Sequence, residues 1–285
     1  MAKKAVNYTL DEQLVSVIAR EFGPEDELAV SGMLAHSFVA CVLAQRMYAP
    51  KMRVYADAKG KWPMTNLLRF PYAPGMPPED AVEKLANMDD VFECMLSGRF
   101  NNIMQPAQID MYGNMNISCF GDWHKPARPL VGARGVPDNT TNGARIYYTV
   151  PKHEKRSFME KVDFVCGVGW TKERREGKIK YGGVTKVFSN LGVFDFDQKK
   201  TGRMRLLSYH TGVTVKQIVE NTGFELIIPK DVKETAAPSE EELMLMREVV
   251  DPGGIRRMDF VSKEDSAKIM KELTDGTTYE MIYGK

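Results

Sequence analysis

The stretch ELAVSGMLAHSFVACVLAQRMYAPKMRVYAD, residues 27–57, alternates two short apolar runs with one helical pattern, and it decides the fold. ELAVSGM is a short apolar run that ends at Gly32, and MRVYAD, residues 52–57, is the second. Between them, apolar residues recur at helical spacing from Leu34 to Met47. A strand-helix-strand unit implies a parallel pair with a right-handed crossover. The sequence therefore predicts an α/β protein with a mostly parallel sheet flanked by helices.

Capping boxes and apolar runs predict the other elements. Three pairs form the capping pattern that starts a helix: Thr9 with Glu12, Thr214 with Gln217, and Ser239 with Glu242. Further strands are expected in NNIMQPAQID, ARIYYTV, KVDFVCGV and VTKVFSN, and a hairpin in GVFDFDQKKTGRMRLL, residues 192–207. A long excursion is predicted for residues 58–80, and a helix from near Pro78 to Gly98. We expect one domain over residues 1–252 and an appended helix and tail over 253–285.

Composition excludes several classes of protein. The 285 residues carry 39 basic and 38 acidic side chains, with no basic block interleaved with aromatics, so nucleic acid is not an expected partner. Neither an apolar leader nor a membrane-spanning apolar run is present, which predicts a soluble, cytoplasmic protein without a membrane partner. Four widely spaced cysteines and four histidines show no metal-ligand spacing, and no disulfide framework or metal site is predicted.

The segment GARGVPDN, residues 132–139, is either a turn or a backbone shaped around a ligand. The chain contains no P-loop, HExxH or GxSxG motif, and an isolated Gly-x-x-Gly indicates a turn that needs positive φ. Its neighbours change this interpretation. Upstream, Asp110 and the run Gly113-Asn114-Met115-Asn116 place polar turn residues directly against an apolar strand.

The order of these segments resembles the β subunit of family I coenzyme A transferases, the glutaconate CoA-transferase type. The matching segments are Ser97-Gly98-Arg99, QIDMYGNMN at 108–116, KRSFMEKVDF at 155–164, LGVFDF at 191–196 and HTGVT at 210–214. The resemblance covers residues 10 to 252. It implies the NagB/RpiA/CoA transferase-like fold, a homologous α subunit in an α2β2 assembly, and coenzyme A as part of the substrate without a permanently bound cofactor. It also implies that the backbone N–H groups of Gly132 and Gly135 form an oxyanion hole.

One departure concerns the nucleophile. Transferases of this type carry a catalytic glutamate at the end of the strand that here reads MRVYADAKG, and this chain has Ala56 there with Asp57 beside it. No glutamate lies between Glu27 and Glu79. Asp57 is a weak candidate nucleophile, because it is one methylene shorter and one position displaced, which reverses the face of a strand. A surface or turn-forming role for Asp57 is the alternative.

A branch of the family, the bacterial steroid ring-opening CoA hydrolases, is similar in more detail and also lacks this glutamate in its β subunit. The matching segments are GNMNISCFG at 113–121, GARGVPDNT at 132–140 and SNLGVFDF at 189–196. This resemblance implies hydrolytic cleavage of a carbon-carbon bond beside a ring ketone, in steroid or alicyclic acid catabolism. The working carboxylate would come from the α subunit. The alternatives are a true CoA transferase and a non-catalytic ligand-binding or regulatory subunit.

Six residues beyond Asp57 are therefore candidates for the site. Arg134, with Gly132 and Gly135, would stabilise negative charge, or Arg134 would pair with a carboxylate where the two subunits meet. Asn114, Asn116 and Asn139 are candidates for binding the acyl group or the coenzyme, although asparagines in such turns also bond their own backbone. KERREGKIK, residues 172–180, is interpreted as a solvated loop, with binding of the coenzyme's phosphates as the alternative.

Overall fold

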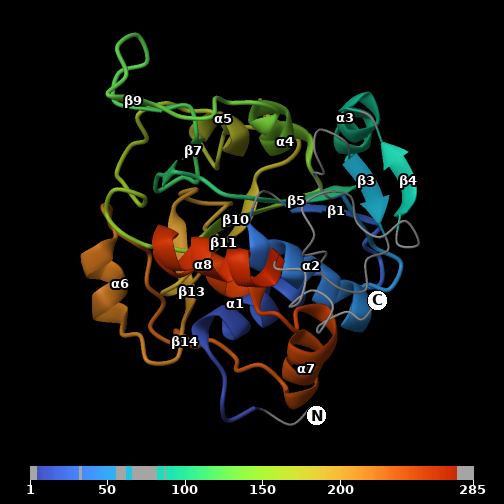
Figure 1. Cartoon of the computed structure of the whole chain (residues 1–285). Helices are drawn as coiled ribbons and strands as arrows, with labels where there is room; N and C mark the ends of the chain where they lie inside the picture. The colour runs from blue at the N-terminus through green and yellow to red at the C-terminus, as the bar shows by residue number, and fades with distance from the viewer. Residues whose placement is uncertain (1–4, 32–33, 56–61, 66–81, 87, 275–285) are drawn as a thin grey trace. The chain divides into compact units, whose positions relative to one another are not determined.

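The computed structural model describes residues 5–31, 34–55, 62–65, 82–86 and 88–274, and the chain divides into two units (Figure 1). Unit 1 comprises residues 1–93 and 236–285, and unit 2 comprises residues 94–235. The boundary falls inside helix α3, Met88–Leu96. Each unit contains strands and helices, so each is an α/β structure.

Unit 1 contains the strand-helix-strand motif that the sequence predicts. Strand β1 (Leu28–Ser31) pairs in parallel with β2 (Arg53–Tyr55), and α2 (Ala35–Met47) connects them. The remaining elements are α1 (Leu10–Ala19), β3 (Trp62–Thr65), β4 (Val82–Ala86), α7 (Glu240–Leu245), the π-helical turn η2 (Met246–Val250), the 3-10 helix η3 (Ile255–Asp259) and α8 (Lys263–Thr274). The expected parallel pair is confirmed.

The prediction for residues 58–98 was wrong in two places. A hairpin strand, β3, lies inside the predicted excursion, and β4 occupies the start of the predicted helix. The two strands pair antiparallel, with Trp62 opposite Ala86, and α3 begins only at Met88. VEKLA fits either a helix or a strand locally, so pairing with a partner decided the outcome. Asp57, with its neighbour Ala56, lies outside the described residues.

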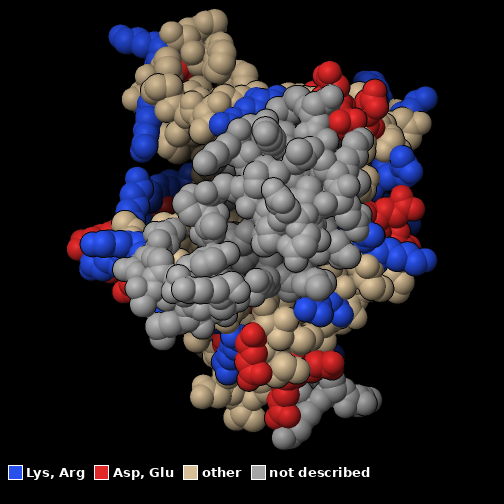
Figure 2. Space-filling model, turned by 45° about the vertical axis from the view of Figure 1, so that its right-hand side comes forward, with Lys and Arg blue, Asp and Glu red and all other residues tan. Residues whose placement is uncertain are grey.

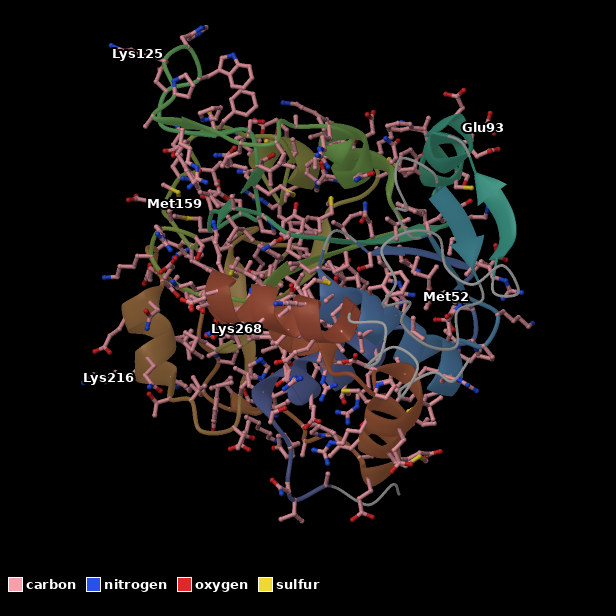
Figure 3. All side chains as sticks on the ribbon, in the orientation of Figure 1. Met52, Glu93, Lys125, Met159, Lys216 and Lys268 are labelled. Carbon is pink, nitrogen blue, oxygen red and sulfur yellow. The ribbon has the colours of Figure 1, made fainter. Side chains whose placement is uncertain are left out.

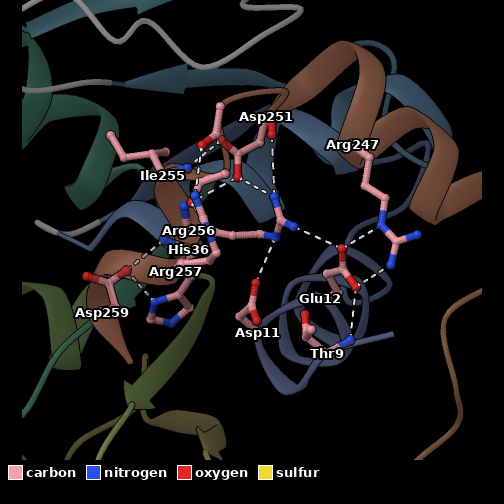
Figure 4. A network of polar contacts seen from close by, with 12 residues as sticks. Thr9, Asp11, Glu12, His36, Arg247, Asp251, Ile255, Arg256, Arg257 and Asp259 are labelled. Atoms are coloured by element: carbon pink, nitrogen blue, oxygen red, sulfur yellow. Dashed lines mark hydrogen bonds and ion pairs between the residues drawn. The ribbon is translucent and has the colours of Figure 1, made fainter. Parts of the chain in front are cut away.

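The segment after residue 252 packs within unit 1. The 3-10 helix η3 lies against α2, where Nδ1 of His36 and Oδ2 of Asp259 are 2.7 Å apart. Arg256, which is 6% exposed, forms ion pairs with three carboxylates: Asp11 at 2.9 Å, Glu12 at 2.9 Å and Asp251 at 2.7 Å (Figure 4). The division at residue 252 itself stays a prediction.

Unit 2 contains a mixed sheet with the strand order β14-β13-β12-β11-β10-β5. The strands are β5 (Phe100–Met104), β10 (Arg145–Val150), β11 (Val184–Ser189), β12 (Gly192–Phe196), β13 (Met204–Tyr209) and β14 (Lys233–Glu234). Strand β10 pairs in parallel with both neighbours, and the predicted hairpin β12–β13 is antiparallel. Helices α4 (Val136–Asn142), α5 (Lys172–Arg175) and α6 (Val215–Asn221) belong to this unit. The expected α/β class, with a sheet flanked by helices, is confirmed.

The strand predicted for KVDFVCGV does not form. Residues 161–168 are irregular, and this part of the chain makes only single bridges to β6 and β7, Ile109 with Phe158 and Met115 with Gly167. Val162 and Cys166 are buried at 3% exposure each, so their apolar character serves packing and not strand pairing. The capping boxes at Thr214 and Ser239 are present as predicted.

Two buried histidines lie in the core of unit 2. His153 stacks on Phe158 with a centroid distance of 3.6 Å, and its ring nitrogens each lie 2.9 Å from a hydroxyl oxygen, Ser189 Oγ and Thr222 Oγ1. His210 Nε2 lies 2.9 Å from the carbonyl oxygen of Ser189. Burial lowers the pKa of His153 from 6.5 to about 3 and that of His210 from 6.5 to about 4.

These pKa shifts predict loss of stability in mild acid. The folded pKa is below the unfolded one, so the stabilisation is complete above pH 6.5 and is lost as the pH falls towards 3 for His153. Each histidine should contribute a slope of up to about 1.4 kcal/mol per pH unit. In urea unfolding between pH 6.5 and 5, His153→Gln should reduce this slope, whereas the exposed His124→Gln should not. Equal slopes in all three proteins would contradict the assignment.

The face of the molecule in Figure 2 is mixed in charge where it is described. Figure 2 shows Lys and Arg in small groups beside Asp and Glu on the described part of this face, without a continuous basic stripe there. Among the described residues, no helix is long and apolar enough to cross a membrane.

Candidate functional site

The turn at residues 110–114 joins two short strands of unit 2, β6 (Gln108–Ile109) and β7 (Met115–Asn116). Its centre, Gly113, has φ +78°, and a Cβ there would lie 2.5 Å from Val184 Cγ1. The Asp110 carboxylate accepts hydrogen bonds from the backbone N–H groups of Tyr112 at 2.9 Å and Asn114 at 3.0 Å. Burial raises the pKa of Asp110, and these hydrogen bonds oppose the increase. The turn is therefore fixed by its own carboxylate.

The amide side chains of Asn114 and Asn116 are occupied inside the protein. Asn114 Nδ2 donates to Asp110 Oδ2 at 2.8 Å, and its Oδ1 accepts from Gly169 N–H at 2.9 Å. Asn116 Nδ2 donates to Gln108 Oε1 at 2.6 Å and to Cys119 O at 2.7 Å, and its Oδ1 accepts from Ser118 N–H at 2.9 Å. Of the two roles left open by the sequence, this geometry favours the structural one.

The Gly132–Gly135 loop follows a short hairpin formed by β8 (Cys119–Phe120) and β9 (Arg128–Pro129). The Gly132 N–H donates to Ile117 O at 3.2 Å, and Gly132 has φ +86° with open space where a Cβ would lie. Arg134 is exposed and has φ +51°, and no other described non-glycine residue has positive φ. This conformation costs an L-residue about 1–2 kcal/mol. An arginine at such a position is a candidate for a function that the conformation serves.

Gly135 begins helix α4, and Asn139 lies one turn further along, donating its N–H to Gly135 O at 2.9 Å. The Gly135 N–H has no hydrogen-bond acceptor within the described ranges. Asn139 Nδ2 lies 3.5 Å from Met104 Sδ, whereas its Oδ1 is buried without a partner among the described residues. An unsatisfied buried amide oxygen costs about 1–3 kcal/mol unless a ligand or water donates to it.

Arg174 supports this helix, and the sequence reasoning missed it. It is 6% exposed, and its guanidinium donates to three carbonyl oxygens, Thr140 at 2.7 Å, Gly169 at 2.9 Å and Val168 at 3.2 Å, and also to Tyr181 O. Burial lowers the pKa of Arg174. The solvated-loop interpretation of residues 172–180 is therefore wrong at this position. The sequence KERREGKIK does not show that Arg174 is buried and Arg175 exposed, because the burial of Arg174 depends on its packing against α4.

The hairpin β8–β9 ends in a loop that projects from the rest of unit 2, with Lys125 at its tip (Figure 3). Trp123 is 52% exposed and stacks on Phe164 at a centroid distance of 4.5 Å. Val131 and Val165 are 58% and 46% exposed. An exposed indole in a projecting loop is typical of a surface that a partner covers.

Two of these groups can donate hydrogen bonds to an anion: the exposed guanidinium of Arg134 and the Gly135 N–H, which has no acceptor among the described residues. The buried Oδ1 of Asn139 in α4 can only accept a hydrogen bond from a neutral or cationic donor. In the part of the chain that the structure describes, no group of three or more His, Cys, Asp or Glu side chains could hold a metal ion. Backbone and guanidinium donors of this kind can stabilise negative oxygen.

The Gly132–Gly135 loop and most of unit 2 lie in the region that a model of the coenzyme A transferase family matches, residues 91–221. The chain belongs to the coenzyme A transferase family. The cholesterol ring-cleaving hydrolase IpdB subunit of Rhodococcus jostii (strain RHA1) is 34% identical over 257 residues, which cover 90% of this chain and 98% of that one. The crystal structure of Rhodococcus jostii RHA1 IpdAB matches 90% of this chain and 100% of its own with a TM-score of 0.79 and 33% identity.

Transferase subunits are also similar over a shorter region. A glutaconate CoA-transferase subunit of Acidaminococcus fermentans is 38% identical over 152 residues, 52% of this chain and 55% of that one. Both relatives are named as enzyme subunits, and the solved structure is of IpdAB. The predicted resemblance to the family I β subunits is confirmed.

Proposed function

We propose that this chain is the β subunit of a heteromeric hydrolase that opens a ring of an acyl-CoA thioester by cleaving the carbon-carbon bond beside a ring ketone. The observation that carries the proposal is the exposed arginine at φ +51° inside the Gly132–Gly135 loop, in a chain whose full-length relatives are ring-cleaving hydrolase subunits. The acyl group is a steroid-derived or similar alicyclic acid. Coenzyme A is part of the substrate.

Within the loop the glycines have different roles. Because the Gly132 N–H already donates to Ile117 O at 3.2 Å, Gly132 provides backbone conformation. The Gly135 N–H, which has no acceptor within the described residues, is the oxyanion donor. Asn139 Oδ1, buried without a partner among them, accepts a hydrogen bond from the substrate.

Arg134 polarises the ring ketone and stabilises the enolate that forms when the ring bond breaks. A carboxylate of the α subunit removes a proton from water, whose oxygen adds to the ketone carbon. The carbon-carbon bond then breaks, the former ketone carbon becomes a carboxylate, and the electron pair of the bond passes to the leaving carbon as the enolate of a neighbouring carbonyl. That carbon takes the proton which the α-subunit carboxylate removed from water. The net change is addition of one water, with the thioester intact.

The test is to co-express the chain with its α subunit and supply a ring-keto acyl-CoA in ¹⁸O-water. The expected product is one water heavier, still carries coenzyme A, and has one ¹⁸O atom in a new carboxylate. Hydroxylamine or borohydride should trap no enzyme-CoA thioester. A trapped thioester, with coenzyme A passing to a free acid and the ring closed, would instead establish the transferase function that the glutaconate relative exemplifies.

The proposal includes a cytoplasmic location, which the four free cysteines support because reduced thiols are usual there. A non-catalytic role would appear as an absence of turnover together with a rise in Tm on adding a phosphosugar but not an acyl-CoA. Asp57, outside the described residues, is a nucleophile only under the transferase alternative.

A further inference from the structure

A pocket of about 840 Å³ opens on unit 2 beside the 110–114 turn, and the function proposed above does not use it. We call it the Tyr112 pocket, and its lining residues are Asp110, Met111, Tyr112, Asn114, Met159, Glu160, Lys161, Thr171, Lys172 and Arg175. Its volume lies in the range of sites for small molecules and cofactors, about 300–1,000 Å³.

The pocket wall is preformed. The carbonyl of Met111 accepts from Met204 N–H at 2.7 Å, and that of Tyr112 accepts from Trp170 N–H at 2.7 Å. Met159 N–H donates to Ile109 O at 3.0 Å, which fixes the opposite segment. The side chains of Met111, Tyr112 and Met159 are half-buried, so the wall offers an apolar and aromatic surface. Such a surface suits a flat ring.

The rim of the pocket is cationic. Lys161, Lys172 and Arg175 are exposed, and within the described ranges Lys161 forms no ion pair. Lys172 Nζ lies 3.6 Å from Glu176 Oε1 with 75% of its side chain exposed, so this pair is weak and can rearrange. Arg175 Nη1 donates to Lys200 O at 3.0 Å, which leaves its other donors available.

The acids of the pocket do not cancel these charges. Asp110 is 4% exposed and its carboxylate is bound by the 110–114 turn, so only Glu160 adds negative charge at the surface of this described pocket. Glu160 and Thr171 supply oxygen acceptors for amino or hydroxyl groups. An apolar wall, a few acceptors and three cations fit a nucleotide with more than one phosphate.

We propose that the Tyr112 pocket binds the adenosine phosphate end of the coenzyme A thioester, with Lys161, Lys172 and Arg175 on its phosphates. This assignment rests on the proposed function for the identity of the nucleotide. Arg174, between Lys172 and Arg175, donates to Thr140 O of α4 at 2.7 Å, so the rim of the pocket and the helix of the Gly135 amide are in direct contact.

Calorimetric titration of the complex with its α subunit tests this, with coenzyme A, adenosine 3′,5′-bisphosphate and inorganic phosphate as probes. Lys172→Ala should weaken binding of the first two probes roughly three- to tenfold, and Lys161→Ala by a similar factor. In turnover, KM should rise by these factors with kcat unchanged. Lys216→Ala is the matched control, because Lys216 is 83% exposed and lies 3.7 Å from Glu220 in the same i,i+4 arrangement (Figure 3).

Each outcome decides one question. Unchanged binding in both pocket variants would overturn the pocket while leaving ring opening intact. If Lys216→Ala weakened binding of coenzyme A equally, or if inorganic phosphate bound as tightly as the bisphosphate, the pocket would attract anions only in general. Either result would also overturn the proposal. Loss of bisphosphate binding in a complex that opens no ring would support the pocket and refute the proposed reaction.

Discussion

Replacing Arg256 with leucine is expected to lower the free energy of unfolding by about 3–5 kcal/mol, a large part of the stability of a typical domain. The side chain is 8% exposed and faces Asp251, Glu12 and Asp11, whose side chains are 0%, 3% and 12% exposed. Without the guanidinium, these carboxylates remain buried close together, where they repel one another and have lost water. Chemical unfolding monitored by circular dichroism measures the change.

Two neighbouring arginines separate this effect from general loss of charge. Arg257 is exposed and donates to Gly254 O at 3.0 Å, so Arg257→Leu should change stability by less than about 1 kcal/mol. Arg247 is 46% exposed and shares Glu12 with Arg256, so its removal should have an intermediate effect. Burial disfavours the Glu12 charge, but Arg247, Thr9 N–H and Arg256 lower the pKa of Glu12 from 4.5 to about 2. Similar losses for Arg256→Leu and Arg257→Leu would refute the central role of Arg256.

Replacing Arg134 with glycine is expected to reduce kcat for ring opening roughly a hundredfold to a thousandfold, the usual effect of removing one donor to an oxyanion. Stability should change by less than about 1 kcal/mol, because glycine accepts φ +51° without strain while the unfolded chain gains freedom. Arg134→Lys should retain part of the activity, since the charge remains without the planar fork. Steady-state assays of the complex, together with thermal unfolding, give both quantities.

The control for Arg134 is Arg128→Gly, an exposed arginine of the preceding strand β9 whose loss should leave kcat within about twofold. Size-exclusion chromatography of each variant with the α subunit tests the alternative that Arg134 pairs with a partner carboxylate. If Arg134→Gly dissociates the complex and added α subunit restores kcat, Arg134 is an interface residue and the catalytic assignment is wrong.

Short-range sequence patterns correctly predicted those helices and strands that depend mainly on residues close together in the chain. Capping boxes at Thr214 and Ser239, the β1-α2-β2 unit and the β12–β13 hairpin all follow from spacing of apolar and capping residues. The β3–β4 hairpin was not predicted from the sequence. The two strands pair with each other, but the sequence between them does not alternate apolar and polar residues in the way that predicts a hairpin. Residues 161–168 were misjudged because a run of apolar residues packs equally well without a strand ladder.

The sequence predicted which residues belong to the candidate site, but not what each of them does. It groups Gly132, Arg134 and Gly135, whereas only the structure shows that the Gly132 N–H already donates to Ile117 O. Arg174 could not be identified, because the sequence does not show which arginine of KERREGKIK turns inward to the carbonyls of residues nearby in the chain and of Thr140 in α4. The structure therefore leaves the candidate site where the sequence placed it, but changes which N–H groups can act as hydrogen-bond donors there.

The internal bonding of Asn114 and Asn116 changes how a Gly-Asn-x-Asn motif should be used when genomes are searched for such enzymes. Both amides hold the protein's own backbone, so the motif marks a chain that can fold this way, whatever it catalyses. A search built on this motif would collect transferases, hydrolases and inactive subunits alike. Under the function proposed above, sorting them by reaction requires the residue at position 134, which the motif does not include.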